Sequence, residues 1–356
     1  MTRTIVRLAT ILMLVGIVIS ACGTAATPAP AETSAPPPTT APTEKPAVTY
    51  NFLLMGALVH PFYGPMPNGI ADAAAKYGIS PVPEFTMPQK FDIVEQFAII
   101  DSHVAKGMNG LAFQPDDPAA ANAKITDLQN LGISVVNIGG CPVLPSPSPF
   151  CLTTNTEELA YQSAKHLAEE LGGKGNIVHF TGQLEDTNSV NSMNGVDRAL
   201  KEYPGITLLK HVPGCDAGPD AAQSLVSSTF AAFGDEIDGV VATSGIATDV
   251  IANEFRKSGE QGIMYIGLNN FDVILQAIRD GFATGTMAQN PYGQAYLATY
   301  SLKLMTDGCK YTGKDFYVDT GMLYITKANI DKQAEELAKV TSDLAANWKE
   351  NNFSCP

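Results

Sequence analysis

Residues 51–63 read Asn-Phe-Leu-Leu-Met-Gly-Ala-Leu-Val-His-Pro-Phe-Tyr, and this stretch decides the fold. Its near-continuous apolar run is typical of a strand that is buried on both faces of a parallel sheet. Pro61 restricts His60 to an extended or turn geometry, and two aromatic residues follow at once. Ligands of doubly wound sheets bind at the carboxyl ends of the strands. The stretch therefore predicts both a buried strand and one wall of a ligand site.

Strand and helix patterns alternate along the rest of the chain in two series, which a long connection near residues 141–151 separates. The helix expected at about residues 90–106 and the helix expected at about 157–171 each place apolar residues on one face. Strands joined by single helices form parallel βαβ units with right-handed crossovers. The chain is therefore predicted to be an α/β protein with two similar doubly wound parallel-sheet domains. Residues 328–348 are expected to form one last helix that docks on a domain surface.

The N-terminus has the pattern of a secretory signal. Two arginines precede an apolar run at residues 8–19, which is too short to span a bilayer comfortably. The run ends in Ile-Ser-Ala-Cys at residues 19–22, which resembles a bacterial lipobox. We expect a signal peptide at residues 1–21, lipidation of Cys22, and a disordered Pro- and Thr-rich linker at residues 22–47. An ordinary signal peptide with a chance cysteine is the alternative.

The composition narrows the partners and the compartment. A formal net charge of −14 argues against nucleic acid and against adsorption to an anionic membrane surface. We expect a monomer that is held outside the cytoplasmic membrane, in the periplasm or on the outer cell face, and that touches the membrane only through its lipid anchor. Such a domain meets extracytoplasmic solutes, so no cofactor is expected.

The cysteines are predicted to form disulfides, which an extracytoplasmic compartment permits. Cys141 and Cys151 bracket a Pro-rich loop and are the first candidate pair, and Cys309 with Cys355 is a weaker second. Cys215 would then remain a free thiol. A metal site is not expected, because the cysteine spacings match no zinc pattern and the five histidines are scattered.

Five segments, in order and at matching intervals, resemble the periplasmic sugar-binding proteins of bacterial ABC importers, of the ribose-binding type. They lie at residues 60–63, 110–115, 241–245, 266–270 and 286–291. The resemblance implies two α/β domains joined by three hinge crossings, which close on a solute and deliver it to an ABC permease. It implies an N-terminal domain of residues 48–152 plus 291–318 and a C-terminal domain of residues 153–290 plus 319–356.

The chain departs from the ribose-type pattern at its charged positions. Gly139 and Gly140 stand where such members have Asp-Arg, and residues 186–195 are rich in amides where they carry an Arg. Asn269 replaces an Asp, and Ser244 replaces an Asn. The charged clamp of a ribose site is therefore missing, and the particular sugar cannot be inferred.

A neutral polyol needs amide side chains, which offer a donor and an acceptor together, and aromatic faces for its C–H surfaces. Both kinds occur at the predicted strand ends, and the resemblance points to several of the same positions. Our candidate ligand-binding residues are His60, Phe62, Tyr63, Gln114, Asn188, Asn191, Asp216, Ser244, Asn269 and Gln289. Most have a structural alternative: core packing for the aromatic residues, helix or loop caps for Ser244 and the asparagines, a loop or hinge salt bridge for Asp216, and a solvated turn for His60.

Other classes of function find less support in the sequence. The chain has no Gly-x-Ser-x-Gly, His-Glu-x-x-His or Walker motif, which argues against an enzyme. A transcriptional regulator would need a DNA-binding segment where the lipobox stands. We predict an extracytoplasmic lipoprotein that captures a small neutral polyol, with a monosaccharide first. A nucleoside or autoinducer ligand, or a receptor that senses its ligand without importing it, is the alternative.

Overall fold

The structure is a computed structural model that describes residues 48–184 and 186–356. The predicted signal peptide, Cys22 and the linker lie outside these residues. The segment Ala47–Pro356 forms one compact unit. Within the described ranges, no helix is both long and apolar enough to cross a membrane.

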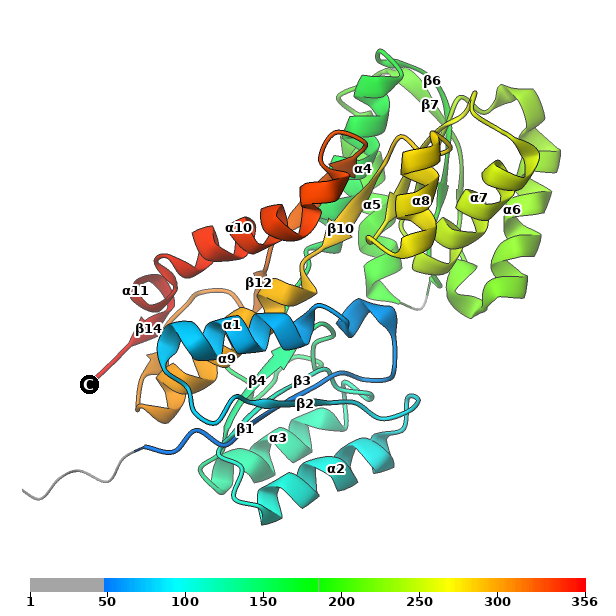
Figure 1. The fold of residues 1–356 in the computed structure, drawn as a ribbon. Coiled ribbons are helices and arrows are strands. Elements are labelled where there is room, and N and C mark those ends of the chain that lie inside the picture. The colour runs from blue at the N-terminus through cyan, green and yellow to red at the C-terminus, as the bar shows by residue number, and fades with distance from the viewer. Residues whose placement is uncertain (1–47, 185) are drawn as a thin grey trace, which may run out of the picture. The chain divides into compact units, whose positions relative to one another are not determined.

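The first sheet has six parallel strands in the order β12-β5-β4-β3-β1-β2 (Figure 1). Its strands are β1 (Phe52–Met55), β2 (Glu84–Thr86), β3 (Gly110–Phe113), β4 (Ser134–Ile138), β5 (Cys151–Thr153) and β12 (Tyr317–Asp319). All four residues of β1 are buried, and neighbouring residues enter different cores: Leu54 lies in one core and Leu53 lies in another. The strand predicted from residues 51–63 is therefore buried on both faces.

Four helices cover this sheet. They are α1 (Met66–Tyr77), α2 (Ile93–Ala105), α3 (Ala121–Asn130) and α9 (Pro291–Thr306). Helix α9 lies beside α1 although the two come from distant parts of the chain (Figure 1). A Cβ atom at Gly69 would lie 2.3 Å from the carbonyl oxygen of Tyr292, so glycine permits this close approach.

The second sheet repeats the arrangement in the order β13-β10-β9-β8-β6-β7, and only β13 is antiparallel to its neighbour. Its strands are β6 (Lys174–Phe180), β7 (Gly205–Val212), β8 (Gly239–Ala242), β9 (Met264–Leu268), β10 (Gly285–Gln289) and β13 (Met322–Thr326). Its helices are α4 (Thr156–Glu170), α5 (Thr187–Leu200), α6 (Pro219–Phe233), α7 (Gly245–Ser258) and α8 (Asp272–Asp280). Helices α4 and α5 share one core, and the other three share a second core.

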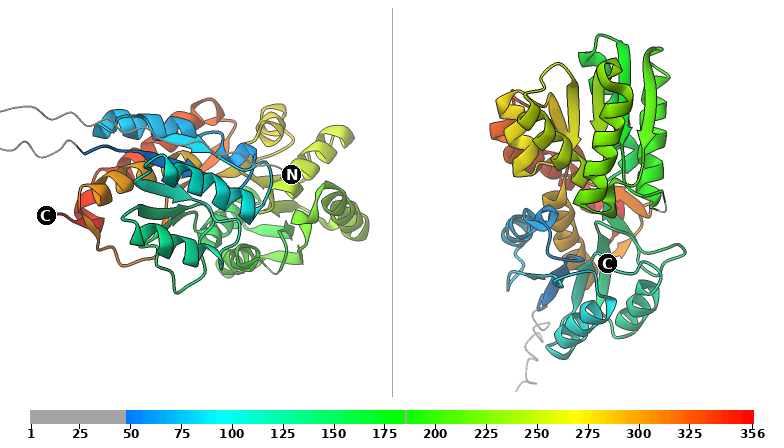
Figure 2. Two further views of the ribbon diagram at one scale, coloured as in Figure 1. Left: turned by 90° about the horizontal axis from the view of Figure 1, so that it is seen from below. Right: turned by 90° about the vertical axis from the view of Figure 1, so that its right-hand side faces the viewer.

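Three short segments connect the two sheets. The chain passes from β5 to α4, from β10 to α9, and from β12 to β13, as Figure 2 shows from two further sides. Both sheets use the same order of their first five strands, with the switch between the first and third. The predicted fold of two doubly wound α/β domains is confirmed.

The C-terminal end differs from the single helix that we predicted. It consists of the 3-10 turn Ile330–Lys332, α10 (Gln333–Ala345), α11 (Trp348–Asn352) and β14 (Phe353–Ser354), which pairs with β11 (Lys310–Tyr311). Trp348 and Phe353 lie in a core of the first sheet, and Trp348 Nε1 donates to Ser301 Oγ at 2.9 Å. The predicted domain boundaries stay a proposal, which this packing would refine by moving the chain's last residues to the N-terminal domain.

Both candidate disulfides are present, between Cys141 and Cys151 and between Cys309 and Cys355. Cys215 is a buried free thiol, as predicted. The first disulfide ties the connection after β4 to β5, next to the first crossing between the sheets.

Candidate ligand-binding cleft

A cavity of about 530 Å³ lies where loops after strands of both sheets meet. This volume falls within the range of small-molecule sites, about 300–1,000 Å³. Eight of the ten candidate residues line it, namely His60, Phe62, Tyr63, Gln114, Asn188, Asp216, Asn269 and Gln289. Asn191 and Ser244 do not line it. The strand ends singled out in the sequence therefore converge on one cleft.

The first wall begins with the segment after β1. His60 caps a short 3-10 turn, Pro61–Tyr63, by accepting a hydrogen bond at Nδ1 from the N–H of Phe62. Phe62 is partly exposed and stands edge-on to Tyr63, with ring centroids 5.2 Å apart. Tyr63 is only 2% exposed, so its ring contributes packing and its hydroxyl group is the part that acts on the site.

The Tyr63 hydroxyl positions Gln114. It donates to Gln114 Oε1 at 2.9 Å and accepts from the N–H of Ala57 at 3.2 Å. Burial raises the pKa of Tyr63 to about 12, so the hydroxyl stays protonated and remains a donor. Gln114 Nε2 is left as the donor toward the cleft.

Gly139 and Gly140 give Gln114 its room. A Cβ atom at Gly139 would lie 2.3 Å from Gln114 Oε1, and one at Gly140 would lie 3.1 Å from Nε2. Gly139 also has a φ of +68°, which larger residues adopt only under strain. The departure from Asp-Arg at these positions therefore replaces a charged pair with space for an amide.

The second sheet contributes an amide pair. Gln289 Nε2 donates to Asn269 Oδ1 at 3.0 Å, which leaves Gln289 Oε1 as an acceptor and Asn269 Nδ2 as a donor. Asn269 adopts a φ of +66°, and its backbone is held by Met287 and Thr286. Asn269 does not cap the next helix, since α8 begins after Phe271 without a side-chain cap. The pair offers a donor and an acceptor together, which suits a hydroxyl group.

Asp216 and Ser244 act as a pair. Ser244 Oγ donates to Asp216 Oδ1 at 2.5 Å and accepts from the N–H of Ala247, so Ser244 caps α7 and orients the carboxyl group. Withdrawal from water raises the pKa of Asp216, and the charge of Asp186 adds to this, whereas the hydrogen bond from Ser244 lowers it. A Cβ atom at Gly182 would lie 2.2 Å from Asp216 Oδ2, so glycine is needed beside this carboxyl group.

Several lining residues escaped the sequence analysis. Phe271 stands edge-on to His60 at 5.6 Å, and Phe91 is an exposed aromatic residue at the rim. Thr153, at the first crossing, and Asp249, inside α7, are two further examples. Phe271 could have been found from its place just after a strand end. Asp249 could not, because nothing in a helical pattern shows which polar residue faces a cleft.

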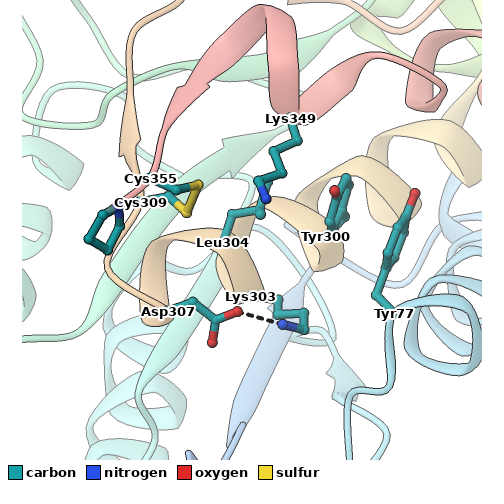
Figure 3. Close-up of a pocket in the computed structure, with 9 residues that line it drawn as sticks. Tyr77, Tyr300, Lys303, Leu304, Asp307, Cys309, Lys349 and Cys355 are labelled. Carbon is teal, nitrogen blue, oxygen red and sulfur yellow. Dashed lines mark hydrogen bonds and ion pairs between the residues drawn. A yellow bond between two sulfur atoms is a disulfide. The ribbon is translucent and has the colours of Figure 1, made fainter.

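A second hollow, of about 400 Å³, lies beside the disulfide between Cys309 and Cys355 (Figure 3). Lys303 pairs with Asp307 at 2.5 Å within it, and none of the candidate residues lines it. Across the described ranges, no group of three or more His, Cys, Asp or Glu side chains could hold a metal ion. The cleft between the sheets is therefore the candidate site.

The chain belongs to the periplasmic binding protein domain family, whose model matches residues 52–310. This is a family of solute-binding proteins, and the predicted family is thereby confirmed. Lipidation of Cys22 stays a prediction.

Two relatives of known binding activity are similar over most of their length. A xylitol-binding protein of Mycolicibacterium smegmatis is 25% identical over 252 residues, which cover 69% of this chain and 69% of that protein. A xylose/arabinose-binding protein of Sulfolobus acidocaldarius is 24% identical over 297 residues, covering 76% and 69% respectively.

Solved structures share the fold. A solute-binding protein of an ABC transporter from Burkholderia graminis, in complex with D-arabinose, has a TM-score of 0.68 at 22% identity and covers 80% of this chain and 98% of that chain. An arabinose-binding protein from Geobacillus stearothermophilus has a TM-score of 0.72 at 19% identity, covering 80% and 98%. At these identities the likeness concerns the fold alone.

Proposed function

We propose that the protein is an extracytoplasmic solute-binding component of an ABC importer and that it captures a small neutral polyol in the cleft. Five-carbon sugars and sugar alcohols are the first candidates, because the xylitol-binding and xylose/arabinose-binding relatives are similar over most of the chain. The observation that carries this proposal is the set of amide groups left available in one cleft: Gln114 Nε2, Asn269 Nδ2 and Gln289 Oε1.

The chemistry of these groups fits a polyol. Each hydroxyl of a sugar both donates and accepts, and the cleft offers donors and acceptors from both sheets. Phe62, Phe91 and Phe271 add aromatic surface that can cover the C–H groups of the solute. A buried polar group that the wrong solute leaves unpaired costs about 1–3 kcal/mol, which allows such a site to discriminate between solutes.

The proposed mechanism is closure at the three crossings between the sheets. One side of the cleft binds the solute first, and the other side then closes over it and removes it from water. The closed protein would present both domains to a permease. In this proposal the chain is a monomer without catalytic activity or cofactor and is held at the membrane by lipid on Cys22.

A thermal-shift screen of residues 48–356 tests the proposal. The panel contains xylitol, arabitol, xylose, arabinose, other monosaccharides, nucleosides and autoinducers. A bound polyol or sugar raises the melting temperature by mass action, by more at higher ligand concentration. If no sugar or polyol shifts the transition and a nucleoside or autoinducer does, the proposed ligand class is wrong and the alternative holds.

A further inference from the structure

Asp249 places a carboxyl group in the cleft. It lies in the second turn of α7 and lines the cavity together with Gly245 and Ile246 of the same helix. Its Oδ1 is buried and has no hydrogen-bond partner within the described ranges. A buried carboxylate oxygen without a partner is costly for a folded protein, so its presence calls for an explanation.

The surrounding charges do not explain it. Among the described residues, neither Lys nor Arg lines the cavity, and its only other ionisable side chains are His60, Tyr63 and Asp216. Burial lowers the pKa of His60, so this histidine is neutral at pH 7 and provides no balancing charge. Among the described residues, the cleft therefore holds two carboxyl groups and no positively charged side chain.

We propose that the Asp249 carboxylate accepts a hydrogen bond from a hydroxyl group of the ligand, and that together with Asp216 it excludes anionic solutes such as sugar acids and sugar phosphates. This inference rests on the proposed function and narrows its ligand class. A ligand hydroxyl in the cavity that Asp249 lines would give this carboxyl group a donor, and a hydrogen bond to a charged acceptor is stronger than one between neutral groups. An anionic ligand would meet two like charges in a partly dry site.

If Asp249 serves the ligand and not the fold, its replacement should raise the stability of the ligand-free protein. Burial raises the pKa of Asp249 to about 6, so the folded ligand-free protein holds this proton more tightly than the unfolded chain does, although the carboxyl group is still mostly charged at pH 7. Ionising Asp249 therefore costs more free energy in the folded protein than in the unfolded chain, so its charge at pH 7 lowers the free energy of unfolding. Replacing Asp249 by the neutral, similarly shaped asparagine should stabilise the ligand-free protein while weakening the complex.

Calorimetry of wild-type residues 48–356 and of the Asp249→Asn variant tests the inference. The ligands are xylitol, D-xylose and L-arabinose, with D-xylonate and D-glucuronate as acids. We expect Asp249→Asn to bind the preferred neutral solute at least tenfold more weakly and to melt at a higher temperature without ligand. The wild type should bind the acids at least a hundredfold more weakly than the neutral solute, and Asp249→Asn should narrow that gap.

Asp235→Asn is the matched control, because it makes the same charge change at an exposed residue of the same domain that does not line the cavity. Its affinity should stay within twofold of the wild type. Equal affinity of Asp249→Asn and the wild type, tight binding of an acid, or a lower melting temperature for ligand-free Asp249→Asn overturns the inference. Failure of the wild type to bind any neutral solute instead overturns the proposed function, and the melting temperatures still test Asp249.

Discussion

Tyr63 acts on the cleft through one oxygen atom. The ring is buried among the residues that pack against α1, while the hydroxyl group joins the loop after β1 to Gln114 at the end of β3. By donating to Gln114 Oε1, it fixes which end of the amide faces the ligand. The aromatic residue that the sequence suggested as a stacking surface is therefore better understood as a positioning residue.

Tyr63→Phe should separate these roles. The variant keeps the ring but leaves the N–H of Ala57 and Gln114 Oε1 without their partner, which should lower the free energy of unfolding by about 1–3 kcal/mol. Ligand affinity should fall too, since Gln114 loses its fixed orientation. Urea unfolding and calorimetry measure the two effects. Tyr77→Phe is the control, because Tyr77 does not line the cleft, and unchanged affinity in Tyr63→Phe would remove the positioning role.

At this scale the sequence located residues well when they follow strands directly. Gln114 and Asn269 do so, Gln289 is the last residue of its strand, and all three line the cleft. The sequence did not show which way a helical side chain faces. Asn191 was a candidate but does not line the cleft, and Asp249 was not a candidate but lines it. The sequence left open whether Ser244 caps a helix or binds the ligand. In the structure its hydroxyl group caps α7 and also donates to Asp216.

At the scale of the elements, the pattern of apolar residues located the regular helices and strands because each packs on a sheet in a periodic way. At the end of the chain the pattern of apolar residues predicted a single helix, which was wrong. Its apolar stripe is shared between two cores: Leu337 packs with the second sheet, whereas Trp348 packs with the first. A helix that must serve two cores is interrupted, and the sequence shows the stripe without showing where it divides.

The disulfide between Cys309 and Cys355 should stabilise this returning tail. It closes a span of 46 residues and lies beside the short ladder of β11 and β14. The double variant Cys309→Ser/Cys355→Ser should lose about 2–4 kcal/mol of unfolding free energy, mainly because the unfolded chain gains freedom. Ligand affinity should stay within twofold, since neither cysteine lines the cleft. Urea unfolding and calorimetry measure both.

The other disulfide provides the contrast. Cys141 and Cys151 span 10 residues, so their removal should reduce stability less by the same argument. However, Cys141 directly follows Gly139 and Gly140, which line the cleft. Cys141→Ser/Cys151→Ser should therefore weaken ligand binding. If only the Cys309→Ser/Cys355→Ser variant lost ligand affinity, the C-terminal tail would have more than a structural role and this prediction would be wrong.

At the scale of the molecule, two sheets with the same strand order are joined by three crossings, and the cleft lies at the ends of their strands. The sequence predicted this plan because the βαβ rhythm occurs twice and the resemblance supplied the crossings. It could not predict which groups of one sheet meet those of the other. The approach of His60 to Phe271 joins loops that are far apart in the chain, and no local pattern encodes it.

The stability of the whole molecule should depend on pH through a buried histidine pair in the second sheet. His179 is fully buried in β6, with Nδ1 2.8 Å from Nδ1 of His211 and Nε2 2.8 Å from Thr243 Oγ1. His211 in turn contacts Asp197 at 3.1 Å. Burial, aided by the charge of His211, lowers the pKa of His179 to about 3. A histidine in the unfolded chain titrates near its ordinary value, about 6.5.

The sign follows from these two values. Below about pH 6.5 the unfolded chain takes up a proton at this position and the folded protein does not, so the stability present above pH 6.5 is lost as the pH falls toward 3. The loss should be about 1.4 kcal/mol per pH unit in that window, in addition to the effects of other groups.

Urea unfolding of the wild type and of His179→Gln between pH 7 and pH 4 measures this loss. The variant should be less stable at pH 7 but lose stability less steeply, whereas His166→Gln, at a partly exposed histidine, should keep the wild-type slope. If the unfolding free energy of the wild type and of His179→Gln falls equally steeply with pH, then His179 takes up a proton in the folded protein and this prediction is wrong.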